Sequence, residues 1–387
     1  MPLQATVFSR VLQQLPWAVF DRAVAQHQMD KGHRGLDARS HLVALLAGQL
    51  IEAHGLRDIE AVLATHAPSL QRRRITPACR STLADANKVR SPAAFEAMIP
   101  ALLAELSPTQ ARRTKEDLRL VDATLIHPGR GSEKWAQFQN GKLGAKVHVV
   151  YDPKAQLPVF YELTSGNTND ITLAKAKMPI EAGATYIFDL GYYDFGFWAE
   201  LDRQGCRFVT RLKKNTPVTV LAERPLPADS SLVCDKIVTL PQRLAKSRKN
   251  PFAKPGRMVI VTLDTGKQLR LLSNDLESPA ETIADLYKTR WHVELFFRWI
   301  KQNLRIRRFH GRSENAVRLQ IAAAIITYLL LKLLHNAAKT TKTAAVFLAS
   351  LRHALFQRIE LDTLVDRIER RTRKTPAALP PQLELAL

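Results

Sequence analysis

The stretch Leu118-Arg-Leu-Val-Asp-Ala-Thr-Leu-Ile126 decides the fold that we predict from this sequence. Apolar residues dominate it, and one acid, Asp122, stands at its centre. A short apolar run of this kind predicts a buried β-strand. A carboxylate within such a strand is costly unless it is paired, hydrogen-bonded or bound to a cation. Asp122 is therefore a candidate site residue, although a structural ion pair or a turn would explain it as well.

Similar β-type runs continue along the chain beyond this stretch. We predict strands over 145–151, 158–163, 185–190 and 207–212, with helices near 170–178 and 195–204. Adjacent strands followed by strand–helix alternation predict a mixed α/β sheet flanked by helices. Residues from about 215 to 275 are β-rich and basic. We interpret them as an insertion in an α/β domain that spans 113–335.

The chain on both sides of this domain is predicted to be helical. Leucines recur at helical spacing over 42–50, within residues 1–112. The basic run 72–74 in the same region favours a helical DNA-binding region, but it suits the solvated face of a plain helical bundle equally well. Residues 336–387 predict a helical C-terminal region that ends in a basic, Pro-rich tail.

The charge and the composition of the chain limit the kinds of molecule that it is expected to bind. The 387 residues include 57 Lys or Arg and 36 Asp or Glu, a formal net charge of +21. Such an excess favours a polyanion, either nucleic acid or an anionic membrane surface. The longest apolar run, 321–334, is shorter than a membrane span and contains Lys332, so it predicts a buried helix and no membrane association. Three widely spaced cysteines predict neither disulfides nor a zinc site, which fits a protein of the reducing cytoplasm. They are Cys79, Cys206 and Cys234.

A second candidate acid closes a later strand. Asp189 lies in Tyr186-Ile-Phe-Asp-Leu-Gly-Tyr192, where Gly191 indicates a tight turn just beyond the strand. A carboxylate at this position suits a metal site or an ion pair, and it is also a common turn residue. Asp189 is the stronger candidate of the two aspartates because the chain turns directly after it.

The most clearly specified helix of the chain begins near Ser278. Ser278, Pro279 and Glu281 predict an N-cap, a proline at the first helical position and a capping box. The apolar pattern predicts that this helix continues to about Leu304.

Four residues of this helix share one face. They are Tyr287, Arg290, Glu294 and Lys301. Their separations of three, four and seven positions keep the side chains on one side of a helix. An exposed Arg–Glu pair at i and i+4 would explain two of them without any function. However, residues 288–308 contain seven Lys or Arg and a single acid, Glu294. A lone carboxylate among so many cations suits a metal ion that lies beside phosphates.

These residues carry a resemblance to a known family. The tyrosine, arginine, glutamate and lysine over 287–301 resemble in full the YREK motif of the insertion-sequence-four family of bacterial DDE transposases. Asp122 in Val-Asp-Ala-Thr and Asp189 in Phe-Asp-Leu-Gly-Tyr resemble the first and second catalytic carboxylates of that family. The resemblance covers residues from about 115 to 335 and leaves room for the family's β-rich insertion.

The resemblance implies a ribonuclease-H-like fold and an enzyme that cuts and joins DNA strands. Asp122, Asp189 and Glu294 would be the catalytic residues and would hold two Mg²⁺ ions, which Mn²⁺ can replace. The implied partners are double-stranded DNA, namely the element's terminal inverted repeats and the target, with a dimer acting on DNA at the bacterial nucleoid. The implied DNA contacts on the helix are Tyr287, Arg290, Arg298 and Lys301.

Basic residues on neighbouring elements extend the predicted DNA surface. Lys146 lies on a predicted strand with His148 on the same face, where a satisfied strand pair is an equal alternative to DNA contact. Asp170 either orients the site or caps the helix that follows it. The residues after another strand are predicted phosphate contacts: Arg211, Lys213 and Lys214.

Two alternatives to a transposase stay open. A related metal nuclease would use the same carboxylates, because both reactions begin with hydrolysis. A DNA-binding protein could keep the fold without cutting. Relatives that form a DNA hairpin carry a tryptophan near the position of Leu269, where it receives a flipped base, so a hairpin intermediate is not predicted for this chain.

Overall fold

A computed structural model describes residues 5–32, 35–107, 116–226, 231–242, 249–304, 306, 308–360, 363–364 and 366. Its internal contacts divide the chain into two compact units. The terminal unit consists of Met1–Ala86, Ser91–Leu106 and Ala322–Leu387. The sheet unit consists of Asn87–Arg90 and Ser107–Ile321. The prediction of functional boundaries near 112 and 335 stays a prediction.

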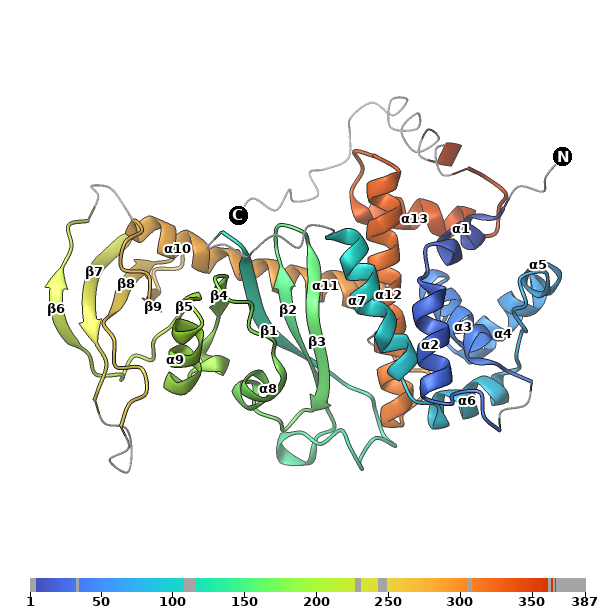
Figure 1. Ribbon diagram of the computed structural model, residues 1–387, viewed down its shortest axis with the longest axis horizontal. Coiled ribbons are helices and arrows are strands. Elements are labelled where there is room, and N and C mark those ends of the chain that lie inside the picture. Colours follow the sequence, from blue (N-terminus) through green and yellow to red (C-terminus); the bar gives the residue numbers. More distant parts are fainter. Residues whose placement is uncertain are drawn as a thin grey trace. The chain divides into compact units, whose positions relative to one another are not determined.

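The sheet unit contains a nine-stranded mixed sheet in the order β3-β2-β1-β4-β5-β9-β8-β7-β6 (Figure 1). β4 runs parallel to both β1 and β5, whereas the other neighbouring pairs are antiparallel. The predicted mixed α/β sheet is therefore confirmed, and the five strands predicted in its first part lie within two residues of their expected bounds. The strands are β1 (Leu118–Ile126), β2 (Ala145–Asp152), β3 (Leu157–Ser165), β4 (Thr185–Phe188), β5 (Arg207–Arg211), β6 (Thr219–Glu223), β7 (Leu232–Thr239), β8 (Gly256–Thr262) and β9 (Gln268–Ser273).

The β-rich segment predicted over 215–275 continues the same sheet. β9 pairs antiparallel with β5, Val209 lying opposite Ser273, and β8, β7 and β6 follow in turn. β6 lies at the edge, and each of its five residues is exposed. The segment therefore lengthens the same sheet on the side of β5 away from β1.

Helices pack on both faces of this sheet. Even-numbered residues of β4 and β5, such as Tyr186 and Phe208, join a core with the buried Trp198 of α9. On the other face α11 contacts β1, and Phe296 stacks on Tyr151 with ring centroids 5.0 Å apart. Figure 1 shows α10 and α11 crossing behind the strands and α8 and α9 in front. The bounds are η1 (Gln139–Gly141), α8 (Asp170–Lys177), η2 (Leu190–Tyr192), α9 (Phe195–Arg203), α10 (Ala280–Thr289) and α11 (Trp291–Asn303).

The single helix predicted from Ser278 to Leu304 is two helices that meet at Arg290. Arg290 keeps right-handed angles (φ −53°, ψ −29°), so the helical phase of the side chains is preserved across the junction. The predicted cap is wrong, because α10 begins after Pro279 and has no side-chain cap. The Ser278 hydroxyl is engaged elsewhere: it donates to Asp275 at 2.6 Å and accepts from Arg207 at 3.2 Å.

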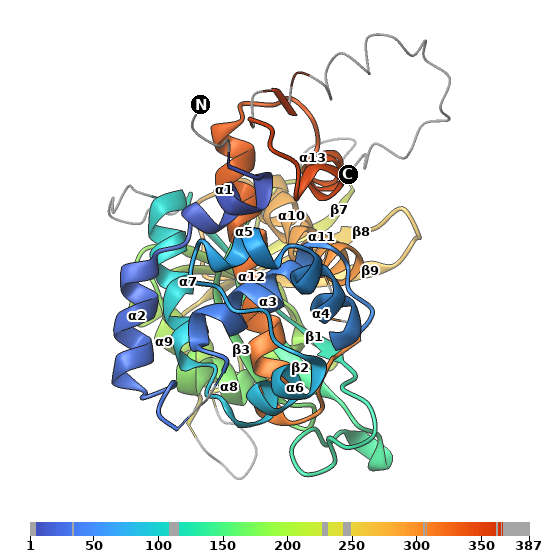
Figure 2. The same cartoon turned by 90° about the vertical axis from the view of Figure 1, so that its right-hand side faces the viewer.

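The described part of the terminal unit is helical, as predicted (Figure 2). All residues of α3 except Arg39 are buried, which makes α3 the core helix of that unit. α12 is long and apolar enough to cross a membrane, but 83% of its most apolar window is buried, so the predicted buried helix is confirmed. The helices are α1 (Val7–Gln13), α2 (Trp17–Gln26), α3 (Ala38–Leu50), α4 (Leu56–Thr65), α5 (Ala67–Gln71), α7 (Ala93–Leu106) and α13 (Ala344–Ala354), with α6 (Arg80–Val89) and α12 (Glu314–Ala337) shared between the units.

Candidate active site

The two candidate aspartates come from neighbouring parallel strands. Leu118 lies opposite Thr185 and Val121 lies opposite Phe188 in the pairing of β1 with β4. Continuing this register by one residue brings Asp122 beside Asp189, because both pairs are 67 positions apart (185 − 118 and 189 − 122). Residues in register on adjacent strands point to the same face. The fold therefore gathers both carboxylates at one end of the sheet.

Asp189 is held by the turn that follows β4. Its side chain caps η2, with Oδ1 accepting a hydrogen bond from the Gly191 N–H at 2.8 Å. A Cβ atom at position 191 would lie 3.0 Å from Asp189 Oδ1 and 3.1 Å from Asp170 Oδ2. Glycine is required at this point because any side chain would crowd two carboxylates.

Arg290 joins the other two candidate residues. Its Nη1 lies 3.3 Å from Asp122 Oδ2, and its Nη2 donates to Glu294 Oε1 at 2.5 Å. The side chains of Asp122, Arg290 and Glu294 are 19%, 18% and 31% exposed, so solvent and ligands reach all three. One guanidinium thus links a strand to a helix 168 positions further along the chain.

The remaining two residues of the predicted helix face are Lys301, which contacts β1, and Tyr287, which lies beside Arg290. Lys301 Nζ donates to Thr124 Oγ1 at 2.6 Å and to the Leu125 carbonyl at 3.1 Å, which holds α11 against β1. The Arg290 guanidinium carbon lies 5.9 Å from the centroid of the Tyr287 ring. Burial raises the pKa of Tyr287, and the nearby guanidinium of Arg290 opposes that shift.

The carboxylates carry more negative charge than Arg290 offsets. Burial raises the pKa of Asp122 to about 6, and the neighbouring carboxylates of Asp189 and Glu294 add to the increase. The Ala123 N–H, which donates to Asp122 at 2.8 Å, and the charge of Arg290 act in the opposite direction. A further cation near these acids would be electrostatically favourable.

The three carboxylates offer only oxygen donors, which hard divalent cations prefer. Among the described residues, no three His, Cys, Asp or Glu side chains converge closely enough to bind one metal ion. The guanidinium of Arg290 stands between Asp122 and Glu294 and satisfies one oxygen of each. The donor set therefore fits a divalent cation once Arg290 releases these oxygens.

Comparison with known proteins identifies the family of this chain. A family model described as the transposase DDE domain matches residues 113–330, more than half of the chain. The chain belongs to the DDE transposases. A transposase of Sinorhizobium fredii, y4zB, is 38% identical over 76% of this chain and 83% of its own length. The sequence-based resemblance is thereby confirmed.

Further relatives of the transposase carry insertion-sequence names. The transposase for element IS5377 of Geobacillus stearothermophilus is 31% identical over 65% of each chain, and that for element IS4SA of a Synechocystis species is 26% identical over 66% of this chain and 71% of its own. Among solved structures, the piggyBac transposase in a synaptic complex with hairpin DNA aligns with 96% of this chain and 81% of that chain, at a TM-score of 0.46 and 11% identity. A model for a domain of unknown function matches residues 3–72. The protein is a metal-dependent DNA transposase of the insertion-sequence-four family.

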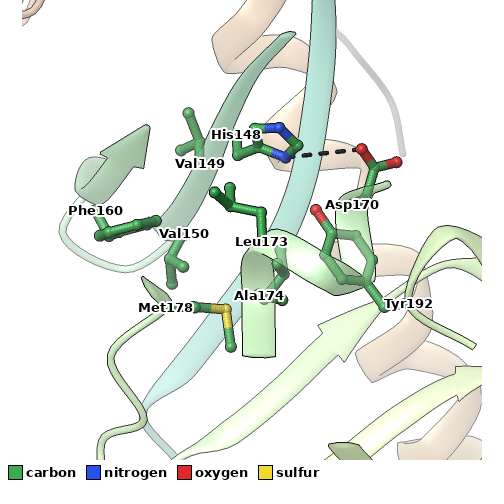
Figure 3. Close-up of a pocket in the computed structure, with 10 residues that line it drawn as sticks. His148, Val149, Val150, Phe160, Asp170, Leu173, Ala174, Met178 and Tyr192 are labelled. Carbon is green, nitrogen blue, oxygen red and sulfur yellow. Dashed lines mark ion pairs between the residues drawn. The ribbon is translucent and has the colours of Figure 1, made fainter. Parts of the chain in front are cut away.

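A small cavity of the transposase lies beside the carboxylates, between β2 and α8 (Figure 3). At its polar end, Asp170 Oδ1 lies 2.9 Å from Lys146 Nζ and 3.7 Å from His148 Nδ1. Burial lowers the pKa of His148 to about 4, so the imidazole is neutral and Lys146 is the ionic partner of Asp170. Asp170 does not cap α8, whose N-cap is Asn169.

Tyr192 completes this polar cluster and was not singled out from the sequence. Its side chain is buried, and its hydroxyl has no hydrogen-bond partner among the described residues. Burial raises the pKa of Tyr192, and the nearby carboxylates of Asp170, Asp122 and Asp189 raise it further. Figure 3 shows the ring pointing towards Asp170. The only signal in the sequence is its place three residues after Asp189.

The other predicted DNA contacts differ in whether their basic groups already bond to other groups of the chain. The Lys146 ammonium donates to Asp170 and to the Thr168 carbonyl, so it is used within the chain. Lys213 and Lys214 are exposed after β5, and Arg270, which the sequence did not indicate, donates to the carbonyls of both. Arg211 lies close enough to Tyr287 to lower its pKa. The guanidinium of the exposed Arg298 lies 5.6 Å from the centroid of the Trp291 ring.

Proposed function

We propose that Asp122, Asp189 and Glu294 are the catalytic carboxylates with which this transposase cuts and joins DNA strands. The observation that carries the proposal is the position of Arg290, which binds Asp122 and Glu294 while the strand register brings Asp189 beside Asp122. We further propose that β1 to β5 and their helices form a ribonuclease-H-like core, and that β6 to β9 are its insertion.

We propose that the three carboxylates hold two Mg²⁺ ions, for which Mn²⁺ can substitute. Ions of this kind activate the attacking oxygen and stabilise the leaving oxygen in phosphoryl transfer. The proposal is supported by the all-oxygen donor set and by the nearness of Asp189 and Glu294 to Asp122, whose charges add to the increase in the pKa of Asp122 that burial causes.

The basic residues of this site would grip and orient the DNA backbone. Arg290 has a planar fork that suits two phosphate oxygens, so a phosphate can replace the carboxylates as its partner. Tyr287 supports the guanidinium from one side, and Lys301 keeps α11 on β1. Residues around the site would extend the DNA contact: Arg211, Lys213, Lys214 and Arg298.

The reaction has two steps in this proposal. Water attacks a phosphodiester at the end of the element, forming one P–O bond and breaking another, which leaves a 3′-hydroxyl and a 5′-phosphate. The 3′-hydroxyl then attacks a phosphodiester of the target DNA in the same way. The substrates would be the double-stranded terminal inverted repeats and the target, paired by a dimer on DNA in the bacterial cytoplasm.

A cleavage assay on labelled DNA that carries the element's ends tests the proposal. Asp122→Asn, Asp189→Asn and Glu294→Gln should each lose cutting with Mg²⁺ or Mn²⁺, while their DNA binding in EDTA stays close to that of wild type. Glu200→Gln is a matched control, because Glu200 lies on the surface of α9 and binds only Arg203 and Gln204 within the described residues.

The outcomes separate the alternatives. Cutting without joining to a target would indicate a metal nuclease. Binding by wild type without any cutting would indicate a DNA-binding protein that has lost catalysis. If Glu294→Gln lost binding and cutting to the same extent, Glu294 would not have the role that we assign to it.

A further inference from the structure

The terminal unit contains an open groove of about 300 Å³. Three segments line it: the chain at the start of α1, the end of α5 with the turn after it, and the chain that follows α13. A smaller cavity of about 120 Å³ shares most of the same lining and extends towards His66 and Phe356. The polar lining of the groove consists of Thr6, Ser9, Ser69, Arg72, Arg73 and Arg358.

The groove carries positive charge that no acid among its described lining residues neutralises. Its lining holds three guanidiniums and three hydroxyls, and no described acid belongs to it. Arg73 and Arg358 form no ion pair with any described residue, and Arg72 donates only to the Pro68 carbonyl at 3.2 Å. Glu360, two positions after Arg358, pairs with Arg10 instead.

The arginines after α5 stand on a fixed turn. Leu70 and Ile75 are buried on either side of them, and the Ile75 N–H donates to the Leu70 carbonyl at 3.1 Å. Arg74 closes the turn with a φ of +58°, a left-handed conformation that reverses the chain at a helix end. Arg72 and Arg73 therefore project from a backbone that is anchored at both sides, and binding a ligand would not have to order that backbone.

Arg358 is anchored by the other end of the chain. The N–H groups of Phe8 and Val7 donate to the carbonyls of Leu355 and Gln357 at 2.7 and 3.0 Å. Phe356 stacks on His66 with ring centroids 3.8 Å apart and an interplanar angle of 11°. These contacts fix the backbone around Arg358, which lines the groove together with Arg72 and Arg73.

We propose that this groove binds phosphate groups of the DNA backbone, as a docking site separate from the carboxylates. The inference rests on the proposed function in one respect, namely that double-stranded DNA is the substrate. Arginine forks and hydroxyl donors are the groups that recognise phosphate oxygens, and they do so without reading base sequence. The groove is open and its arginines are exposed, which suits a continuous polyanion. The proposal gives a role to part of residues 3–72, the segment matched by the model for a domain of unknown function.

The test compares DNA binding by full-length variants that lose the same charge from different places. Arg73→Ala/Arg358→Ala removes two groove arginines. Arg22→Ala/Arg57→Ala removes two exposed arginines of the same unit that lie outside the groove. Binding to a duplex of arbitrary sequence is measured by fluorescence anisotropy in EDTA over a range of salt concentrations, and thermal melting confirms that each variant is folded.

We expect the groove variant to bind on the order of tenfold more weakly and to lose about two units of salt slope, because each lost phosphate contact removes about one unit. The control variant should keep both values close to wild type. Arg73→Lys/Arg358→Lys should recover the slope but only part of the affinity, because lysine keeps the charge and lacks the fork. Equal losses in the groove and control variants would overturn the proposal.

Inorganic phosphate distinguishes a DNA site from a site for a free anion. If millimolar phosphate raised the melting temperature of wild type but not of the groove variant, while both bound duplex equally, the groove would bind a small anion and the DNA proposal would be wrong. Since binding is measured in EDTA, no cleavage contributes to the result. The groove proposal can therefore fail while metal-dependent cutting by the carboxylates succeeds, and the reverse is equally visible.

Discussion

Arg119, Arg257 and Arg290 of the sheet unit each bind carboxylates, and the first two differ from the third in how they do so. Arg119 is fully buried, donates to both oxygens of Glu181 at 2.7 and 2.8 Å, and reaches Asp152 at 3.0 Å. Arg257 is 2% exposed and places two nitrogens on Asp235 at 2.8 and 2.6 Å. In both cases two parallel hydrogen bonds join one fork to one carboxylate, and the guanidinium is buried.

Arg290 divides its fork between two acids and leaves a third beside them. Asp122 and Glu294 each receive one of its nitrogens, and Asp189 lies close enough to raise the pKa of Asp122. All the groups joined by Arg290 are partly exposed. The comparison teaches that a buried pair with complete hydrogen bonding stabilises the fold, whereas a divided and accessible pair can exchange its partners for a ligand.

The largest effect should come from breaking a buried pair. Arg257→Met leaves the Asp235 carboxylate buried without its cation, which should lower the free energy of unfolding by about 3–5 kcal/mol. The double variant Arg257→Met/Asp235→Leu should recover most of this loss, because apolar pairs of similar size often replace buried ion pairs without cost. Urea unfolding measures both, and a single variant as stable as wild type would break the comparison.

The same substitution in the divided pair should act on ligands more than on folding. Arg290→Met should cost about 1 kcal/mol of stability, because water already reaches its partners. We expect DNA binding to lose about one unit of salt slope. Affinity for Mn²⁺, measured by titration calorimetry, should rise roughly tenfold, because one positive charge beside the carboxylates is gone. A lower Mn²⁺ affinity would show that Arg290 does not compete with the metal.

Two buried tyrosines allow a similar comparison with a smaller expected effect, because one hydroxyl is hydrogen-bonded and the other has no partner in the described structure. The Tyr186 hydroxyl accepts from the Glu181 N–H at 2.7 Å, so Tyr186→Phe should destabilise the protein by about 1 kcal/mol. The Tyr192 hydroxyl has no partner in the described structure, so Tyr192→Phe should leave the stability unchanged or raise it slightly. Thermal unfolding compares them, and an equal loss in both variants would reveal a hydrogen bond at Tyr192.

The smallest effect is expected at the surface. Arg203 pairs with Glu200 three positions earlier on α9, and its side chain is 72% exposed. Arg203→Ala should leave the unfolding midpoint and the cleavage rate unchanged within the precision of the measurement, because water screens the pair. A clear loss of stability would mean that exposure is a poor guide to which arginines matter in this fold.

The strands around the site could be predicted because their residues are locally apolar. The runs at β1, β4 and β5 stand out from their surroundings, and the turn after Asp189 is marked by Gly191. β6 shows the limit of this reasoning, since its short apolar run over 220–222 is exposed and lies at the edge of the sheet. Its membership of the sheet depends on the pairing of β9 with β5, which joins residues at least 60 positions apart.

The sequence predicts which residues make up the candidate site, but not which contacts these residues make in the folded chain. The face shared by Tyr287, Glu294 and Lys301 follows from helical spacing, which needs no knowledge of the rest of the fold. The failed cap at Ser278 and the use of Lys146 by Asp170 both arise from partners that only the folded chain brings near. Arg290 could be expected beside Glu294 four positions away, but its second bond depends on the docking of α11 against β1.

The link between the two chain ends has a consequence for synthesis on the ribosome. Arg10 pairs with Glu360, 350 positions later, and the start of α1 is hydrogen-bonded to the chain after α13. Contacts over such distances form late, because the intervening chain must be made and folded first. The strands of the sheet unit emerge well before residue 358 and can pair while translation continues. A nascent chain thus has its sheet before its arginine groove, and only a molecule translated beyond residue 358 can close that groove.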